Sequence, residues 1–276
     1  MSRMHKVHKA TEAAKKSAPP CPSANRASQS SLQSLLQTPL KSNHPQSNPP
    51  TLILASQSPN RIAALTMAGI PFSVMPSHIN ERELNDADPK KLVTKIAAAK
   101  AQSIACSLAA EKNYPLNSTN KVLVLAADTV GVLNSRILLK PDSLAEVRKT
   151  ITSFSGAEFK AVTGICLISV TPQAASNAAP SAFQAASQKI RQKTDVLSIM
   201  FRKLTPADVQ AYTQNNKKLF HFPGGFDPEE ALKHRFITDI KGSFTHFMWA
   251  LPFEVVIPLL VSEGFPLSPA LAQRYT

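Results

Sequence analysis

The residues best suited to chemistry in this chain are hydroxyls, cations and carboxylates of the kind that bind and cleave phosphates. Arg and Lys side chains neutralise phosphate oxygens, and carboxylates activate water or hold a divalent cation. Brought together in one pocket, such groups would serve a triphosphate bound with Mg²⁺. These positions are Ser56, Ser58, Arg61, Glu81, Lys100, Asp128, Thr129 and Lys140.

The two serines and Arg61 surround the start of a predicted helix. Residues 52–55 are apolar and predict a short buried strand. Ser58 and Pro59 then predict a helix start, with Ser58 as N-cap and Pro59 in the first turn, and Gly69 ends this helix. A helix N-terminus with nearby hydroxyls and an arginine forms an anion site. Ser-Pro is more often only a helix cap, so this segment alone is weak support.

Lys100 lies on what the sequence predicts to be the buried face of a helix. This helix begins at Asp88-Pro89 and runs to about Glu111, and Lys100 falls in the middle of its apolar arc, between Ile96 and Ile104. A buried lysine is costly unless its charge is paired or used. Its long stem could instead carry the ammonium out to water, but the large apolar side chains on both sides favour a functional role slightly.

Asp128 and Lys140 are predicted to meet through a β-hairpin. The apolar run 122–125 predicts a strand covered on both faces, and Asp128 follows at its C-terminal end, a common place for ligand-binding carboxylates in α/β sheets. Two further strands are predicted around an Asn134-Ser135 turn, in a register that sets Thr129 opposite Lys140. Mg²⁺ and phosphate could bridge such an acid and base. A strand-end turn or a surface salt bridge would leave the same sequence pattern.

Other common site signatures do not occur in the sequence. Seven histidines and three cysteines show neither metal-ligand nor disulfide spacing, which argues against a zinc site and favours idle thiols in a reducing compartment. There is no Walker phosphate loop and no glycine-rich dinucleotide fingerprint. Glu81, taken alone, is an ordinary loop acid.

Alternating strands and helices predict an α/β domain over residues 51–276. Further predicted strands are 71–76, 159–170 and 193–202, and further predicted helices are 143–154 and 206–214. The apolar stretch 247–261 predicts a core strand followed by a helix, and it is too short to cross a bilayer. Residues 171–190, rich in Ala, Ser and Gln, predict a flexible insertion.

Residues 1–50 differ in composition from the rest of the chain. They are rich in Ser, Pro, Gln and Lys, and they hold seven basic residues but a single acid, Glu12, within an overall charge of +13. Such a segment cannot bury enough apolar surface to fold, so we predict a disordered basic tail. The composition also resembles an organellar transit peptide, although the small number of arginines favours a plain tail and a cytoplasmic protein. A nucleic-acid partner has little support, since aromatic interleaving and a recognised module are both missing.

In order and spacing, these segments resemble the Maf family of nucleoside triphosphate pyrophosphatases. The resemblance covers about residues 51–262, apart from the insertion, and it is specific because many short motifs occur in the family's order. Those motifs are Leu54-Ala55-Ser56-Gln57-Ser58-Pro59-Asn60-Arg61, Glu81 after Pro76-Ser77, Lys100-Ala101, Ala127-Asp128-Thr129-Val130, Lys140-Pro141, Ser155-Gly156, Val162-Thr163-Gly164, and Gly242-Ser243 followed by Leu251-Pro252.

The resemblance implies a two-lobed α/β fold of the Maf and ITPase kind, with a long mixed sheet flanked by helices, often assembled as a homodimer. It implies cleavage of a nucleoside triphosphate into monophosphate and pyrophosphate with Mg²⁺ or Mn²⁺, in a housecleaning role that removes unwanted nucleotides. By position, Asp128 would be the general base and, with Glu81, a metal ligand. The other implied roles are charge neutralisation by Arg61, Lys100 and Lys140, phosphate binding by Ser56 and Ser58, and binding of base or sugar by Thr129, Gly225 and Glu229.

Departures from the family pattern leave the substrate and the activity open. Asn60 stands where many members carry the first of two arginines. The loop 223–229 has the Phe and Glu of the branch that acts on 7-methyl-GTP, whereas Asp128-Thr129 resembles the branch that acts on dTTP and UTP. The alternative to an enzyme is a catalytically weak nucleotide-binding regulator linked to cell division, through the family's connection with septum formation.

Overall fold

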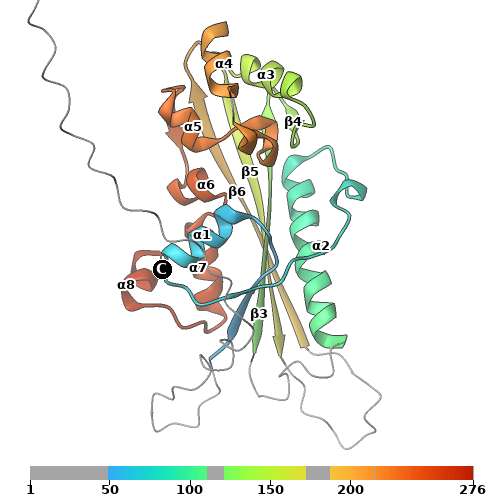
Figure 1. Ribbon diagram of the computed structural model, residues 1–276. Coiled ribbons are helices and arrows are strands. Elements are labelled where there is room, and N and C mark those ends of the chain that lie inside the picture. The colour runs from blue at the N-terminus through green and yellow to red at the C-terminus, as the bar shows by residue number, and fades with distance from the viewer. Residues whose placement is uncertain (1–48, 111–120, 172–186, 215, 276) are drawn as a thin grey trace, which may run out of the picture. The chain divides into compact units, whose positions relative to one another are not determined.

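One mixed β-sheet with helices on both faces organises the part of the chain that the computed structural model describes, residues 49–110, 121–171, 187–214 and 216–275 (Figure 1). The strands lie in the order β2-β1-β3-β5-β6-β7, and β4 pairs with β3. β1 pairs in parallel with β2 and β3, and the other strand pairs are antiparallel. The predicted α/β class with a mixed sheet flanked by helices is confirmed.

Strands and helices alternate along most of the chain. The strands are β1 (Thr51–Leu54), β2 (Ser73–Val74), β3 (Val122–Leu133), β4 (Arg136–Leu138), β5 (Glu158–Thr171), β6 (Ser187–Phe201) and β7 (Ile237–Lys241). The helices are α1 (Pro59–Met67), α2 (Pro89–Ala110), α3 (Leu144–Ser153), α4 (Pro206–Thr213), α5 (Pro228–Lys233), α6 (Phe244–Trp249), α7 (Phe253–Ser262) and α8 (Pro269–Tyr275), with the 3₁₀ turns η2 (Glu81–Glu83), η3 (Lys217–His221) and η4 (Pro223–Gly225). Within this described part of the chain, none of the helices has both the length and the hydropathy that a bilayer crossing requires.

Side chains on the two faces of the sheet enter separate cores. Along β3, Leu123 and Leu125 pack with α1 and α7 on one face, while Val124 and Ala126 pack under α2 on the other. A strand covered on both faces must be apolar at successive positions. This double cover explains the unbroken apolar run at 122–127.

Another core, rich in phenylalanine, forms where β3 and β5 continue beyond β1. The rings of Phe154, Phe159, Phe201 and Phe226 lie with centroids 5.0 to 6.4 Å apart, tilted or edge-on to one another as aromatic rings prefer. Helices α3 and α4 cover these rings. β3 and β5 supply residues to every one of the cores and therefore tie them together.

One edge of β3 has no strand partner along residues 126–130, a segment we call the open edge. β1 pairs with β3 only as far as Leu125, and β4 takes up the same edge again from Gly131. On its other edge β3 pairs with β5 throughout, with Asp128 opposite Gly164. Asp128 therefore lies in the middle of one long strand, and its predicted place at a strand end is wrong.

The predicted turn at Asn134-Ser135 is confirmed, but β4 is shorter than expected. Both turn residues have positive φ, 48° and 63°, as this two-residue hairpin turn requires, and the strands pair in the predicted register. β4 ends at Leu138, because the following carbonyl accepts a hydrogen bond from the Gly224 N–H and the chain turns away. The predicted pairing of Thr129 with Lys140 is therefore wrong.

The C-terminal apolar stretch folds differently from the prediction. Residues 247–261 form parts of two helices, α6 and α7, in place of a strand and a helix. Ala250 between the helices has a left-handed conformation (φ 50°), and its N–H donates to the His246 carbonyl to close α6. Because both helices pack on cores, the sequence is apolar throughout, and hydrophobicity alone does not separate a buried strand from a short buried helix.

The expected insertion at 171–190 is shorter than predicted. β6 begins at Ser187, because it continues the ladder with β5 to the end of both strands. Residues 172–186 and 1–48 lie outside the described part of the chain. The flexible insertion, the basic tail and the transit segment therefore stay predictions.

Helix α2 comes very close to the sheet at Gly164 on β5. A Cβ atom on Gly164 would lie 2.4 Å from the carbonyl oxygen of Val93 and 2.8 Å from the backbone nitrogen of Thr94. Only glycine leaves room for the helix backbone at this position. Since Gly164 is the strand partner of Asp128, this contact sets the distance between α2 and the middle of β3.

We expect Gly164→Ala to lower the free energy of unfolding by about 3 kcal/mol, near the upper end for an added methyl group, because the atoms in its way belong to the backbone. Urea denaturation would measure the loss. Gly69→Ala is the control, since its φ is +65° but its Cβ would meet nothing within 4 Å. That variant should lose only roughly 1 kcal/mol of stability, the cost of a left-handed conformation for a residue with a Cβ atom. Equal losses in the two variants would contradict the close contact.

Candidate functional site

Lys100 forms a buried ion-pair cluster with two carboxylates. Its side chain is only 10% exposed, and its Nζ lies 2.7 Å from Asp128 Oδ1 and 2.9 Å from Glu81 Oε1. α2 supplies the lysine, β3 supplies Asp128, and the exposed turn η2 brings Glu81 over the pair. The predicted burial of Lys100 is confirmed, and its charge is paired instead of carried out to water.

Asp128 is the carboxylate most affected by its surroundings. Burial raises the pKa of this carboxyl, since the charged form loses its hydration, and Glu81 acts in the same direction. Lys100 and Arg61 oppose the rise by stabilising the carboxylate. The pKa stays above its ordinary value, so Asp128 holds a proton more readily than an exposed aspartate does.

Arg61 ties α1 to the open edge of β3 and to α6. Its Nη1 donates to the Ala127 carbonyl at 2.8 Å, its Nη2 to Thr129 Oγ1 at 2.9 Å, and its Nε to the Ala250 carbonyl at 3.1 Å. Burial lowers the pKa of this guanidinium, while Asp128 and Glu81 act to raise it. A guanidinium has five N–H groups, so two remain for a ligand beyond the acceptors that the structure describes.

The start of α1 brings its backbone N–H groups to the same region. Ser58 occupies the predicted N-cap position and Pro59 the first turn, but the Ser58 side chain does not cap the helix. Instead Ser56 Oγ accepts a hydrogen bond from the Ser58 N–H at 3.2 Å. Arg61 lies in the first turn of this helix, so its positive charge adds to the partial positive charge of the helix N-terminus.

Lys140 is exposed beyond the end of β4 and makes no ion pair with the residues that the structure describes. Its neighbour Leu139 accepts the backbone hydrogen bond from Gly224, at 2.8 Å, so the chain at Lys140 lies beside η4. Gly225 follows in a buried position with φ +74°, where a Cβ would lie 2.9 Å from Val147.

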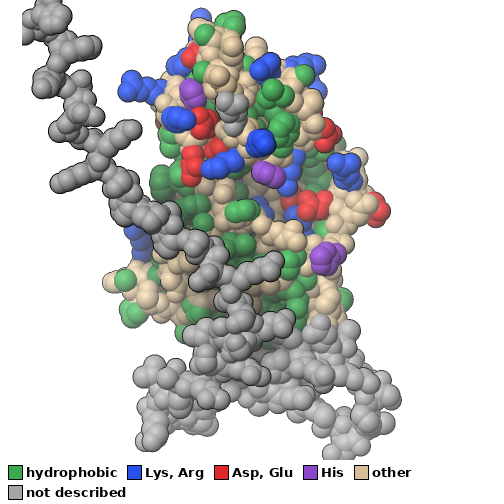
Figure 2. All heavy atoms as spheres, in the orientation of Figure 1, with side chains coloured by type: hydrophobic (Ala, Val, Ile, Leu, Met, Phe, Trp, Pro, Cys, Tyr) green, Lys and Arg blue, Asp and Glu red, His purple; other side chains and the backbone are tan. Residues whose placement is uncertain are grey.

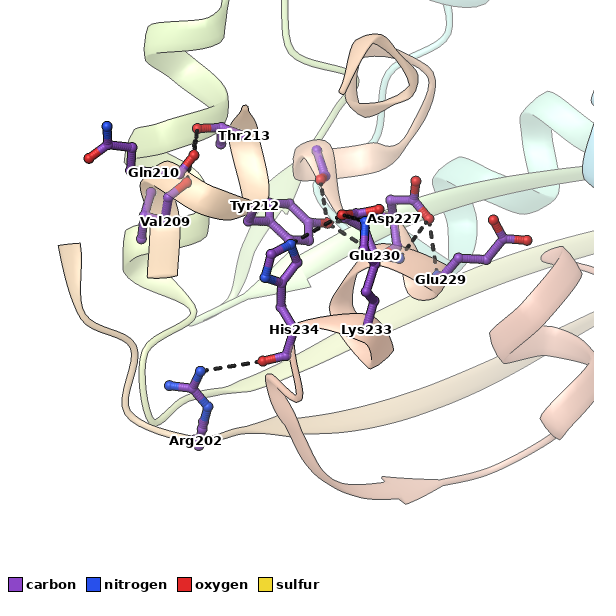
Figure 3. A network of polar contacts seen from close by, with 11 residues as sticks. Arg202, Val209, Gln210, Tyr212, Thr213, Asp227, Glu229, Glu230, Lys233 and His234 are labelled. Carbon is purple, nitrogen blue, oxygen red and sulfur yellow. Dashed lines mark hydrogen bonds and ion pairs between the residues drawn. The ribbon is translucent and has the colours of Figure 1, made fainter. Parts of the chain in front are cut away.

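Gly225 and Glu229 belong to a second polar network, around Tyr212 (Figure 3). The Tyr212 hydroxyl accepts from the Asp227 N–H at 2.7 Å and donates to the Gly225 carbonyl at 3.1 Å. The Glu229 side chain is 67% exposed, and its Oε2 lies 3.6 Å from Lys218 Nζ. In Figure 3 the side chain extends away from Tyr212 and His234. Among the described hydrogen bonds and ion pairs, none joins this network to Lys100 and Asp128. The structure therefore brings Gly225 beside the chain at Lys140 but does not connect Gly225 or Glu229 to the Lys100 ion pairs.

Three residues outside the predicted set contact the site through Thr129. Thr163 Oγ1 lies 2.7 Å from Thr129 Oγ1, His246 Nε2 lies 2.7 Å from Thr163 Oγ1, and Asp195 Oδ2 lies 2.5 Å from His246 Nδ1. A threonine within the apolar strand 159–170 is the one sequence signal that points to this group. Its partners come from strands and a helix far along the chain, which local patterns do not reveal.

The carboxylates suit a Mg²⁺ ion better than a metal held by protein ligands alone. The described residues contain no group of three or more His, Cys, Asp or Glu side chains arranged around a metal. Asp128 and Glu81 do offer oxygens to one common point, since both lie within hydrogen-bond distance of Lys100 Nζ. Mg²⁺ is usually held by one or two carboxylates together with ligand phosphates, and this pair fits that pattern.

The wider surface does not explain anion binding by itself. On the face drawn in Figure 2, Lys and Arg side chains are interspersed with Asp, Glu and His over its upper half. Such a mixture gives no broad positive field. A phosphate ligand would therefore depend on the local cations, Arg61 and Lys100, and on the start of α1.

We expect Lys100→Met to destabilise the chain by roughly 3 kcal/mol at neutral pH, because Asp128 would stay buried without its partner. The pKa of Asp128 would then rise further. A carboxyl with a raised pKa in the folded chain favours folding below its unfolded pKa, and this contribution is lost as the pH rises through the folded pKa. The loss should therefore shrink between about pH 7 and pH 4 in urea titrations.

Glu81→Gln provides the matched control for this variant. Its carboxylate is half exposed, so water can replace the lost ion pair and the pH dependence of stability should stay close to that of the parent. A loss in Lys100→Met that is the same at both pH values would contradict the burial argument.

Comparisons with known proteins agree with the geometry. A family model described as Maf-like protein matches residues 51–262. A relative named dTTP/UTP pyrophosphatase from Mesorhizobium japonicum is 30% identical over 217 residues, covering 78% of this chain and 93% of the relative. Relatives with the same name from Syntrophus aciditrophicus and Rhodopseudomonas palustris are each 31% identical, covering 77% and 79% of this chain and 90% and 94% of the relatives. The match spans β1 through α7 and includes every residue of the Lys100 cluster, and the chain belongs to the Maf family.

Proposed function

We propose that this chain hydrolyses nucleoside triphosphates to nucleoside monophosphate and pyrophosphate, with dTTP and UTP as preferred substrates. The observation that carries the proposal is the buried Lys100, whose Nζ contacts Asp128 and Glu81 beside the guanidinium of Arg61. Relatives that cover more than three quarters of the chain are named for dTTP and UTP cleavage, which supports the same chemistry here.

The cations and the helix start would hold the triphosphate. Arg61 keeps two N–H groups for phosphate oxygens, and the N-terminus of α1 adds backbone donors next to Ser56 and Ser58. Lys140, exposed and without an ion-pair partner among the described residues, would reach the outer phosphates. These contacts neutralise charge that grows on the leaving pyrophosphate.

Asp128 would act as the general base. A water molecule attacks the α-phosphorus, its proton passes to the Asp128 carboxylate, and the bond from that phosphorus to the bridging oxygen breaks as pyrophosphate leaves. The raised pKa of Asp128 makes its carboxylate a better proton acceptor near neutral pH. Lys100 holds the carboxylate at 2.7 Å and so fixes its direction.

A divalent cation is part of the proposal. Without a ligand, Lys100 and Arg61 balance Asp128 and Glu81, so the triphosphate brings negative charge that the cluster alone does not cancel. Asp128 and Glu81 would hold the ion, and a bound Mg²⁺ would supply charge neutralisation and orient the phosphates.

The environment of Phe226 favours dTTP and UTP over 7-methyl-GTP. A methylated guanine base is cationic and is typically held by aromatic stacking with a nearby acid. Phe226 is only 7% exposed and packs against Phe154, Phe159 and Phe201. Its ring therefore serves the core and offers no face to a base, which removes the main sequence argument for the 7-methyl-GTP branch.

Removal of unwanted nucleotides, a cytoplasmic location and a homodimer stay expectations from the family resemblance. The second candidate function is a nucleotide-binding regulator with little catalysis. Asn60 favours it, since an amide at the start of α1 supplies no charge to a phosphate. The complete cluster of Lys100, Asp128, Glu81 and Arg61 favours the enzyme.

We expect pyrophosphate release with Mg²⁺ to be fastest for dTTP and UTP in a panel that includes CTP, 7-methyl-GTP and the common purine triphosphates. Asp128→Asn should lose at least a hundredfold in kcat, the typical contribution of a general base, and should still bind nucleotide. Asp239→Asn, a surface change on β7, is the control and should leave kcat unchanged.

One result would oppose the assigned base, and another would oppose the enzyme. Turnover close to normal in Asp128→Asn would remove the assigned base. Binding of nucleotides without pyrophosphate release across the whole panel, in the parent chain, would support the regulator. Thermal melting of each variant checks that Asp128→Asn remains folded.

A further inference from the structure

A continuous line of hydrogen bonds runs from Arg61 through the sheet to a buried histidine. Thr129, Thr163 and Asp195 are neighbours across β3, β5 and β6, since Thr129 pairs with Thr163 and Thr163 pairs with Asp195. His246 of α6 closes the line, because its two ring nitrogens contact Thr163 and Asp195. The histidine side chain is fully buried and Thr163 is completely inaccessible, so water does not interrupt the contacts.

The chemistry of each group fixes the direction of these hydrogen bonds. The Asp195 carboxylate only accepts, so His246 Nδ1 must carry a proton and donate to it. In the tautomer that carries its single proton on Nδ1, His246 accepts at Nε2 from the Thr163 hydroxyl. With its single hydrogen so used, Thr163 accepts from Thr129, and Thr129 in turn accepts from Arg61 Nη2.

The result is one ordered series in which every member donates toward Asp195. Thr129 meets Arg61 only as an acceptor, because a guanidinium has no acceptor of its own. The same oxygen lies 2.7 Å from Thr163 Oγ1, so the position of Thr163 limits where the acceptor for Arg61 can lie. Asp195 and His246 hold Thr163 in turn and thus act on Arg61 through the two threonines.

We propose that Thr163, His246 and Asp195 are positioning residues for the nucleotide site: they fix the position of the Thr129 hydroxyl and so hold the Arg61 guanidinium in its phosphate-binding orientation. The proposal rests on the function proposed above, because it assigns these residues to the same triphosphate. It adds three residues, from β5, β6 and α6, that do not contact the Lys100 cluster.

The surroundings of His246 support a fixed arrangement. Ser243 Oγ accepts from the His246 backbone N–H at 3.1 Å and caps α6, and Ser243 is itself bonded to Glu254 of α7. Thr245 accepts from the Phe253 N–H at 2.8 Å, which joins the two helices. Among the described contacts, the ring therefore meets the charge of Asp195 directly and that of Arg61 through the two threonines, while Glu254 is linked through Ser243 to the His246 backbone.

A purely structural role for this line would give a different result from a positioning role. Loss of a buried hydroxyl lowers stability wherever it occurs. A positioning role also changes how well the nucleotide is held, while the base at Asp128 remains intact. The distinction is therefore between a change in Tm alone and a change in KM.

The test is Thr163→Val, which removes the hydroxyl and keeps the shape, with pyrophosphate release from dTTP as the readout. We expect KM to rise about tenfold, as for one lost hydrogen bond to a charged group, with kcat within about a factor of two. Thr163→Ser keeps the hydroxyl and should restore KM. Asp195→Asn, which takes away the acceptor-only partner of His246, should also raise KM.

Thr213→Val is the matched control for lost stability. Thr213 is 3% exposed on α4 and accepts from Arg148 Nε at 3.2 Å, so the same chemistry is removed outside the site. Its Tm should fall as in Thr163→Val, with KM unchanged. An unchanged KM in either Thr163→Val or Asp195→Asn, or no rescue by Thr163→Ser, would overturn the proposal.

Failure of the proposed function would look different. If the parent chain releases no pyrophosphate, the same variants are compared by calorimetric titration with dTTP, where a tenfold weaker Kd for Thr163→Val still supports the positioning role. An unchanged Kd in that variant would overturn it. If the parent chain is fully active and the variants have the same KM as the parent, the proposed enzyme function stands, but these three residues have no positioning role in its site.

Discussion

Along the open edge of β3, the two faces of the sheet are not separated by a neighbouring strand. Asp128 belongs to the α2 face and Arg61 reaches in from α1, yet each alters the pKa of the other. In a continuous sheet the Ala127 carbonyl would accept a hydrogen bond from a neighbouring strand, but here it accepts one from Arg61. A longer β1 or an earlier β4 would fill this edge and remove the arginine from it.

The charges at this edge balance one another. Two cations and two carboxylates balance one another inside the fold, so no single charge is buried alone. Glu81 is the exposed member, so water reaches its carboxylate while Asp128 and Lys100 stay buried. The arrangement explains why so many charged groups can be enclosed beside an apolar strand.

The sequence predicts best where a signal is local. The place of Lys100 on an apolar helix face predicts its burial. Thr205-Pro206 is a typical helix start, and in the structure Thr205 and Asp208 form a capping box at the start of α4. The turn at Asn134-Ser135 fixes the hairpin register in the same way. Each of these depends on residues within a few positions of one another.

Contacts between distant segments escape such patterns. The length of β3 depends on its pairing with β5. Asp128, which the sequence places at the end of a strand, therefore lies in the middle of one. Lys140 lies outside the hairpin because its neighbour Leu139 accepts a hydrogen bond from Gly224, more than eighty residues away in the chain. His246 lies just before the stretch 247–261, which the sequence predicts to begin with a strand, and only the contacts of α6 with β5 and β6 show its partners.

β3 and β5 also decide which parts of the molecule can open on their own. Because both strands contribute to every core, opening one core breaks the backbone ladder of the others, and their amide hydrogens should exchange only when the whole fold opens. The turn η2 has no buried residue and can open locally. The part of the site that β3 supplies therefore belongs to the most stable region of the fold, whereas the part that η2 supplies does not.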